Sequence, residues 1–183
     1  EKIQFEEFFY SRVKDQITDN LNGREWNADY INSLLEVLEA TLSYVPSSTS
    51  TGELADVSLY DHVKLTAAFA SCLYQYYQEK EQENYKDIIW KNTKEVYKED
   101  CFMLLSMDIS GIQDLIYTIS TRKALRTLRA RSFYLEILME HMIDCLLEEL
   151  NLSRANLLYS GGGHCYMILP GTVKAPQIVD DYL

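Results

Sequence analysis

The chain has 183 residues, of which 47% are hydrophobic, and this is enough apolar material for one compact domain or two small ones. A disordered protein is therefore excluded. The formal net charge of −11 argues against a protein whose whole surface follows nucleic acid, although one basic patch could still do so.

The cysteines and the apolar runs bear on where the protein works. Cys72, Cys101, Cys145 and Cys165 are widely separated and form no Cys-x-x-Cys pair, which is typical of free thiols in a reducing compartment. No apolar run approaches the roughly 20 residues that span a bilayer, so we expect no membrane role. We therefore expect a cytoplasmic protein. We also expect the chain to be part of a longer protein.

Helical spacing of apolar residues dominates the first part of the chain. One helix is predicted over residues 5–17, before the breaker Asn22-Gly23, and a second over residues 31–42. The stretch Ser58-Leu59-Tyr60-Asp61 is spaced as a capping box that opens a third helix. Apolar and small residues lie nearly all round this third helix, so we expect it to be buried. The charged stretch that follows predicts a linker helix over residues 81–100.

The second part of the chain changes from helical to mixed patterns. Residues 102–107 form a short apolar run without a helical period, which predicts a buried strand. The elements predicted after it are a helix over 112–119, a long helix over 125–151 and two strands over 156–159 and 165–169. Three glycines join the last two strands, and no element is expected after Pro170-Gly171.

This order places the first strand beside the hairpin in one sheet, with the long helix on one face through a right-handed crossover. Such a unit is most of a ferredoxin-like α+β half. The predicted fold class is therefore α+β, with a helical region over residues 1–80 and the linker helix over 81–100. A partial ferredoxin-like palm of the polymerase or cyclase type follows over residues 101–183, incomplete at its C-terminus.

The turn after the first predicted strand and the tip of the hairpin should meet at one edge of the sheet. Asp108, Ser110 and Gly111 would then share one site with residues 160–164. Polymerase and cyclase palms hold two metal ions with carboxylates from both places. Here only Asp108 supplies a carboxylate, and hard cations require several oxygen ligands. We expect a palm that keeps the nucleotide cradle without the metal chemistry.

Several of these residues also have a simpler, structural interpretation. The glycines could do no more than satisfy the backbone of a tight hairpin. Asp108 could cap the following turn, with metal binding as the less favoured alternative. His164 could pack in the sheet or contact an adenine edge rather than catalyse, because no carboxylate lies near it in the sequence to orient it.

Three motifs resemble the large subunit of the type III-A CRISPR effector complex, the Csm complex. They are Asp108-Ile109-Ser110-Gly111-Ile112-Gln113, Leu128-Arg129-Ala130-Arg131-Ser132-Phe133-Tyr134-Leu135 and Asn156-Leu157-Leu158-Tyr159-Ser160-Gly161-Gly162-Gly163-His164. The upstream stretch from Ala55 to His62 also resembles this family. The matches occur in the family's order and spacing from about Ile31 to Pro170, so together they are specific.

The resemblance implies a longer protein with an N-terminal HD nuclease domain, two palms, a zinc-bearing insertion and a C-terminal helical domain. Residues 1–80 would be the end of the HD region. Target RNA would switch on two activities: cleavage of single-stranded DNA at the HD site, with a divalent metal, and synthesis of cyclic oligoadenylates from ATP, with Mg²⁺ or Mn²⁺, between the palms. The Gly-Gly-Asp-Asp of the second palm and any His-Asp dipeptide are absent from this sequence, so we expect the segment alone to be inactive.

The resemblance also implies site residues and partners. The expected nucleotide-binding residues are Ser110, Gly111, Ile112, Ser160, Gly161, Gly162, Gly163 and His164, with Arg131 and Ser132 placed toward phosphate. Because HD domains bind metal through histidine and aspartate, Asp61 and His62 are weak metal candidates together with Asp108, although a histidine such as His62 on a buried helix is more often a packed core residue than a ligand. The expected partners are guide RNA, target RNA, single-stranded DNA and other Csm subunits, especially the one that binds the guide 5′ end.

A basic run without a single acid stands out in this acidic chain. It consists of Arg122, Lys123, Arg126, Arg129 and Arg131. A solvated helix face and a contact with nucleotide phosphates, guide RNA or an acidic partner are equally favoured. The alternative function is therefore an RNA- or protein-binding scaffold surface with a purely structural glycine hairpin. An independent P-loop NTPase is disfavoured, because residues 160–164 lack the Gly-Lys-Ser/Thr ending of a phosphate loop.

Overall fold

The computed structural model describes residues 8–25, 27–50, 52, 54, 56–111 and 124–182. The chain divides into two compact units, residues 1–67 and residues 68–183. None of the helices in the described residues is long and apolar enough to cross a membrane. The expectation of free thiols is confirmed for all four cysteines. Burial raises the pKa of the Cys72 thiol to about 11, which keeps this group uncharged near neutral pH.

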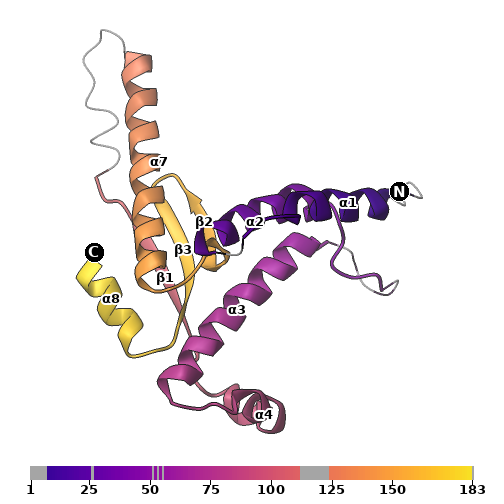
Figure 1. Cartoon of the computed structure of the whole chain (residues 1–183). Helices are drawn as coiled ribbons and strands as arrows, with labels where there is room; N and C mark the ends of the chain where they lie inside the picture. Colours follow the sequence, from indigo (N-terminus) through magenta and orange to yellow (C-terminus); the bar gives the residue numbers. More distant parts are fainter. Residues whose placement is uncertain are drawn as a thin grey trace. The chain divides into compact units, whose positions relative to one another are not determined.

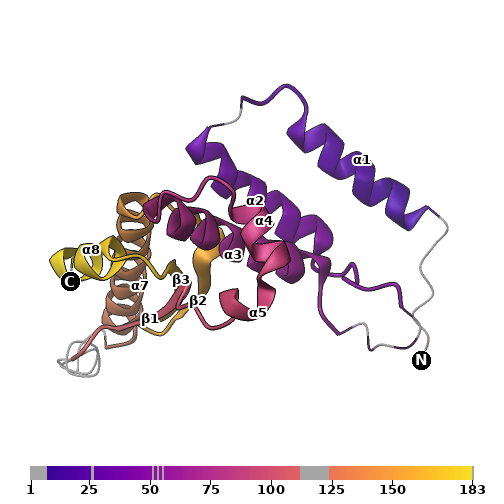
Figure 2. The ribbon, with the colours of Figure 1, turned by 90° about the horizontal axis from the view of Figure 1, so that it is seen from below.

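The first unit is a small helical assembly. Its helices are α1 (Phe9–Leu21), α2 (Ala28–Leu42) and the beginning of α3 (Leu59–Glu79). Helices α1 and α2 lie side by side, as Figure 2 shows, and a small core forms around Leu42, Val45 and Tyr60. The Tyr60 hydroxyl donates to Glu39, and burial raises the pKa of this phenol to about 12.

Helix α3 begins with the predicted capping box. The backbone N–H of Asp61 donates to Oγ of Ser58 at 3.0 Å, and the Ser58 hydroxyl donates to the Asp61 carboxylate at 2.7 Å. The serine therefore satisfies one of the backbone donors that a helix N-terminus leaves unpaired. The capping box gives Asp61, one of the metal candidates, a structural role at the helix N-terminus. The other metal candidate on this helix, His62, is exposed.

The expectation that α3 is buried all round is wrong for this chain. Leu65 and Phe69 are 38% and 40% exposed, whereas Ala68, Cys72 and Tyr76 are buried. Apolar side chains on the other faces of α3 are only partly covered, so the apolar composition of these faces did not predict burial here. In place of the single linker helix predicted over 81–100, the structure has two short helices.

These two helices are α4 (Tyr85–Lys91) and α5 (Thr93–Val96). They are separated at Asn92, whose backbone angles of φ −117° and ψ 32° lie outside the helical range. Asparagine side chains compete for backbone hydrogen bonds, which makes this residue type a common point of interruption. The charged stretch therefore forms two short helices in place of one long helix.

The second unit is built on a three-stranded antiparallel sheet (Figure 1). Its strands are β1 (Phe102–Asp108), β2 (Leu157–Gly161) and β3 (His164–Pro170), in the order β1-β3-β2. Both outer strands pair antiparallel with β3, so β1 and β2 run parallel on either side of it. This is the split β-α-β arrangement of a ferredoxin-like half, and the predicted α+β fold is confirmed.

The long helix α7 (Ala124–Glu149) packs on one face of the sheet, as predicted (Figure 1). Alternate residues of β3, namely Cys165, Met167 and Leu169, meet Ile143 and Leu146 of α7 in the main core. The alternation follows from the two-residue period of a strand. The side chains between them therefore point to the opposite face.

Helix α8 (Lys174–Tyr182) was not predicted, since the residues after Pro170-Gly171 were expected to form no element. Its sequence carries a clear signal. Ala175 and Val179 are buried in the main core at helical spacing. The backbone N–H of Ala175 donates to the Thr172 hydroxyl at 3.2 Å, so a threonine caps the first turn.

Helix α3, from residue 68 onward, packs on the opposite face of the sheet at one end. The rings of Phe69 and Phe102 meet edge to face with centroids 5.0 Å apart. Asn156, which is fully buried, donates its side-chain amide to the carbonyl oxygen of Ile168 at 2.9 Å. The other end of this face, near the hairpin, carries exposed or half-buried side chains.

Candidate functional site

The open end of the sheet is the name used here for the exposed side chains at the hairpin end of the face opposite α7. It consists of Ser106, Asp108, Tyr159, His164 and Tyr166. Asp108, the last residue of β1, pairs in register with His164, the first residue of β3. The Ile109 N–H donates to the Gly163 carbonyl at 2.9 Å. The structure therefore brings the end of β1 and the glycine hairpin together, as the strand order predicted.

The hairpin depends on glycine at two positions. Gly162 and Gly163 have φ angles of +63° and +83°, in the left-handed region that favours glycine. Two residues of this kind at the centre of a two-residue loop are typical of the turns that match the twist of antiparallel strands. The loop is therefore tight and carries no side chains of its own. The site is instead lined by side chains of the neighbouring strands.

His164 is the centre of a polar chain. Its Nδ1 lies 3.2 Å from Oδ1 of Asp108, and its Nε2 lies 3.0 Å from the Tyr166 hydroxyl. The Ser106 hydroxyl lies 3.4 Å from the same Nε2. The two ring nitrogens of His164 therefore have different partners, a carboxylate at Nδ1 and hydroxyl groups at Nε2.

The expectation that no carboxylate orients His164 is wrong. Asp108 supplies one from 56 residues earlier in the chain, because strand register and not sequence distance decides which side chains meet. The predicted strand order brings Asp108 near the hairpin but does not fix the register that pairs it with the histidine.

Two tyrosines complete the open end of the sheet and were missed as site residues. The rings of Tyr159 and Tyr166 have centroids 6.4 Å apart, and Tyr166 meets the His164 ring edge to face at 4.9 Å. Tyr159 is 55% exposed and Tyr166 is 38% exposed. The signal for Tyr166 was the strand period of two, which puts it on the same face as His164. Tyr159 reaches this face through the register shift between Leu157 and Tyr159.

Gly161 makes room for Tyr159. A Cβ at position 161 would lie 2.7 Å from the Tyr159 hydroxyl oxygen, closer than side chains approach. The tyrosine side chain therefore lies over the backbone of Gly161, two residues further along β2. This close approach explains the first glycine of the three in terms of packing, whereas the other two are explained by their backbone angles.

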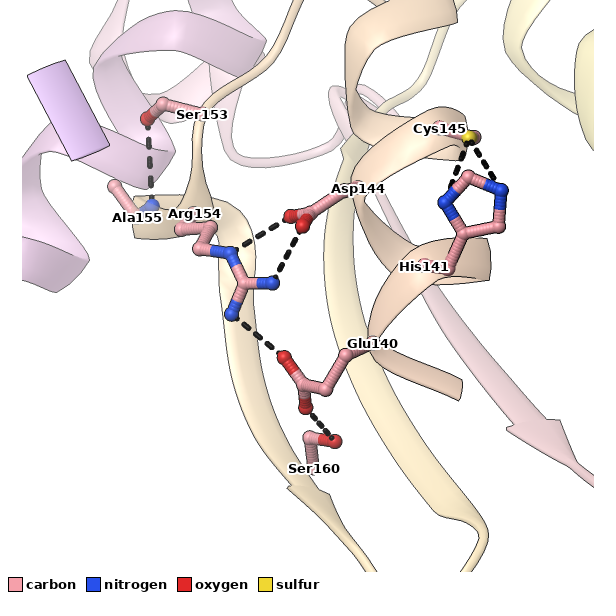
Figure 3. A network of polar contacts seen from close by, with 8 residues as sticks. All are labelled: Glu140, His141, Asp144, Cys145, Ser153, Arg154, Ala155 and Ser160. Carbon is pink, nitrogen blue, oxygen red and sulfur yellow. Dashed lines mark hydrogen bonds and ion pairs between the residues drawn. The ribbon is translucent and has the colours of Figure 1, made fainter. Parts of the chain in front are cut away.

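Ser160 is turned to the opposite face of the sheet. Its hydroxyl donates to Oε1 of Glu140 in α7 at 2.8 Å, as Figure 3 shows. The second carboxylate oxygen of Glu140 accepts from Nη1 of Arg154 at 2.7 Å. Nε and Nη2 of Arg154 both donate to Asp144 at 2.7 Å, and this hydrogen bonding holds the pKa of the guanidinium above its ordinary value.

The remaining predicted residues are spread over the chain. Ser110 and Gly111 follow β1 and are exposed, and Gly111 has a φ angle of +76°. Arg126 and Arg129 are exposed near the start of α7, with the half-buried Arg131 and the exposed Ser132 one to two turns later. Ile112, Arg122 and Lys123 lie outside the described residues.

The donor set does not fit a two-metal centre. Within the described ranges, no group of three or more His, Cys, Asp and Glu side chains is arranged to hold a metal ion. Asp108 is the one carboxylate of the open end of the sheet, and its Oδ1 is engaged by His164. Two divalent cations would need several oxygen ligands, so the chemistry available here is recognition by rings, hydroxyls and backbone amides.

Comparison with known proteins gives consistent matches. A family model described as Csm1 subunit domain B matches residues 101–183. The chain is 48% identical over 177 residues to a protein of Enterococcus italicus (strain DSM 15952 / CCUG 50447 / LMG 22039 / TP 1.5) named CRISPR system single-strand-specific deoxyribonuclease Cas10/Csm1 (subtype III-A). This alignment covers 94% of the chain and 23% of the relative, so the chain spans less than a quarter of the relative's length.

Two similar solved structures contain nucleotides. One is a crystal structure of the Csm1-Csm4 cassette in complex with pppApA, with a TM-score of 0.79, 31% identity, and coverage of 98% of this chain and 23% of that one. The other is the Csm1-Csm4 cassette in complex with AMPPNP, with a TM-score of 0.74, 32% identity, and coverage of 95% and 22%. Both similarities span nearly all of this chain.

Proposed function

Because this chain belongs to the Cas10/Csm1 family of subtype III-A CRISPR systems, we propose that it supplies the non-catalytic ATP-binding wall of an RNA-guided antiviral complex. Residues 101–183 form the first palm in this proposal, after the end of an HD-type region over 1–80 and a linker over 81–100. The full protein makes cyclic oligoadenylates from ATP where this palm meets a second one, and cleaves single-stranded DNA at its HD site.

The proposal extends to the setting in which the full protein works. It acts in the cytoplasm, with guide RNA, target RNA and the neighbouring Csm subunits as partners. The two similar structures named Csm1-Csm4 cassette support an assembly with another Csm subunit. Target RNA that pairs with the guide switches both activities on. This segment by itself is inactive.

The open end of the sheet is the observation that carries the nucleotide-binding proposal. It presents exposed tyrosine rings, a histidine oriented by Asp108 and a tight glycine turn on one surface. Tyrosine rings stack on purine bases, and a purine also offers ring nitrogens and an exocyclic amine to hydroxyl and imidazole groups. The adenine-containing molecules named in the similar structures are of this class.

The metal ions that accompany ATP would have to be held elsewhere in the full protein. ATP carries Mg²⁺ or Mn²⁺, and the ion neutralises phosphate charge and activates the attacking hydroxyl when it is bound. The open end of the sheet lacks the carboxylates for this task. Its own contribution is therefore to bind the base and the sugar, with the glycine turn beside the phosphates, and to exclude water from one side of the nucleotide.

Gly162 offers a sharp test of this proposal. A Cβ at this position meets no other atom within 4 Å, and Asp and Asn tolerate its left-handed backbone better than most residues. We expect Gly162→Asp in the full-length protein to raise the KM for ATP about tenfold, because a carboxylate at the hairpin tip repels the nucleotide's phosphates. Steady-state synthesis of cyclic oligoadenylates in the guide-loaded complex measures this.

Gly162→Asn is the matched control, since it has the same shape and backbone cost but no charge. We expect its KM to stay within about twofold of the unsubstituted protein. Guide RNA binding and complex assembly should be unchanged in both variants. Equal KM values for the aspartate and asparagine variants would contradict the proposal and favour a purely structural hairpin.

A further inference from the structure

We infer that Glu140 is a positioning residue that fixes strand β2 from behind, so that Tyr159 and the glycine hairpin stay presented on the nucleotide face. The inference rests on the proposed function of the open end of the sheet. Glu140 lies on α7, on the opposite face of the sheet, and acts through its hydrogen bond with Ser160. It touches no part of the proposed nucleotide surface itself.

Strand β2 needs such a fixing point because its register is irregular. Leu157 pairs with Met167, but Tyr159 pairs with Tyr166, so the pairing shifts between these two positions. A shift of one residue moves every following side chain to the other face of the sheet. Irregularities of this kind bend a strand and disrupt its hydrogen-bond ladder locally. Tyr159 of the open end of the sheet and the glycine hairpin are the parts that follow the shift.

Ser160 is the first residue after the shift whose side chain meets α7. It pairs with Cys165, whose side chain is fully buried against α7. The hydroxyl of Ser160 satisfies Glu140 only when Ser160 faces α7, and Tyr159 and Gly161 then face the other way. One hydrogen bond therefore selects the face on which Tyr159 is presented.

Glu140 is itself held in place by a charged network (Figure 3). Arg154 donates to Oε2 of Glu140 and, with two parallel hydrogen bonds, to Asp144 one turn further along α7. The side chains of Glu140 and Arg154 are only 36% and 33% exposed. A bidentate arginine pair is more rigid than an exposed single ion pair, so the Glu140 carboxylate has a fixed position when Ser160 meets it.

Three substitutions in the full-length protein separate positioning from packing. Ser160→Ala removes the hydroxyl donor, Glu140→Gln replaces the acceptor of the Arg154 ion pair, and Ser160→Thr retains a hydroxyl. We expect the first two to raise the KM for ATP about fivefold with kcat within about twofold, and the threonine variant to stay near the unsubstituted value. Glu136→Gln is the matched control, because Glu136 is an exposed acid one turn earlier on α7.

Amide hydrogen exchange without nucleotide provides the second measurement. In Ser160→Ala and Glu140→Gln we expect faster exchange in peptides that contain residues 159–163, and unchanged exchange in the core of α7. Unchanged KM and exchange in both variants would overturn the inference. Faster exchange throughout residues 101–183, with kcat and KM both affected, would also overturn it, because that pattern indicates general destabilisation.

The outcome is distinguishable from failure of the proposed function. If Gly162→Asp impairs ATP use and Ser160→Ala does not, the positioning role is wrong and the nucleotide wall stands. If Gly162→Asp and Gly162→Asn behave alike, the nucleotide wall is wrong. In that case the proposal that Glu140 positions a nucleotide-binding surface is overturned as well. The exchange rates would still show whether Glu140 holds the hairpin in place.

Discussion

Replacing Gly171 by alanine should prevent the second unit from folding normally. A Cβ at this position would lie 1.8 Å from the carbonyl oxygen of Asp100. The Gly171 N–H also donates to the Cys101 carbonyl at 2.8 Å, so the two chain segments cannot separate without losing this hydrogen bond. The obstacle is a backbone atom and not a flexible side chain. We therefore expect the free energy of unfolding to fall by about 3 kcal/mol or more.

Soluble yield and calorimetric unfolding of the full-length protein measure the effect of Gly171→Ala. The matched control is Gly52→Ala, because the nearest atom to a Cβ there is the Ser50 hydroxyl oxygen at 3.8 Å, an ordinary contact. The control should unfold at the same temperature as the unsubstituted protein. A Gly171→Ala variant with normal yield and unfolding temperature would show that residues 100 and 171 do not approach as closely as the structure describes.

Replacing Asn156 by alanine is the second substitution with a large expected effect. The Asn156 amide donates to the Ile168 carbonyl at 2.9 Å and contacts the Cys72 sulfur at 3.3 Å, and its oxygen accepts from the Ser71 hydroxyl at 3.2 Å. The residue is 0% exposed, so water cannot replace these partners. We expect the free energy of unfolding to fall by roughly 3 kcal/mol, because the substitution leaves a cavity and buried polar groups without partners.

Asn156→Asp sharpens this prediction. It keeps the shape of the side chain but exchanges the amide donor for an oxygen that faces the Ile168 carbonyl, so it should destabilise the protein at least as much as alanine. Asn84→Ala is the control, because Asn84 is exposed and makes no side-chain cap hydrogen bond. Unfolding monitored by calorimetry should leave the control within about 0.5 kcal/mol of the unsubstituted protein. An unaltered Asn156→Asp variant would contradict the assigned hydrogen bonds.

Much of the fold could be predicted because local patterns in the sequence indicate its helices and strands. Helical spacing identified α1, α2 and α3, and the change to a short apolar run identified β1. Strand order then followed from the connection rules for a strand, a long helix and a hairpin. Helix α8 was not predicted although Ala175 and Val179 are spaced as on a helix, because Pro170-Gly171 ends the preceding strand and the residues after it are mostly polar.

The errors share a physical cause, which is that local patterns do not contain tertiary contacts. Apolar residues such as Val63, Leu65 and Phe69 also lie on the exposed faces of α3, so composition could not tell which apolar residues are buried. At the site, the sequence placed Asp108 near the hairpin but not against His164, which requires the register of β1 and β3. The register shift between Leu157 and Tyr159 leaves no signature in the residues, and the side from which Ser160 is held could not be derived without it.

Hydrogen exchange of the full-length protein with and without AMPPNP tests the central claim most directly. If the open end of the sheet is a nucleotide-binding wall, the nucleotide slows exchange in peptides that contain residues 108–111 and 159–164, whose backbone amides lie at the end of β1 and in the hairpin. Peptides from the middle of α7, on the opposite face of the sheet, should not change. Protection that occurs elsewhere in the protein and leaves both of these segments unaltered would contradict the account.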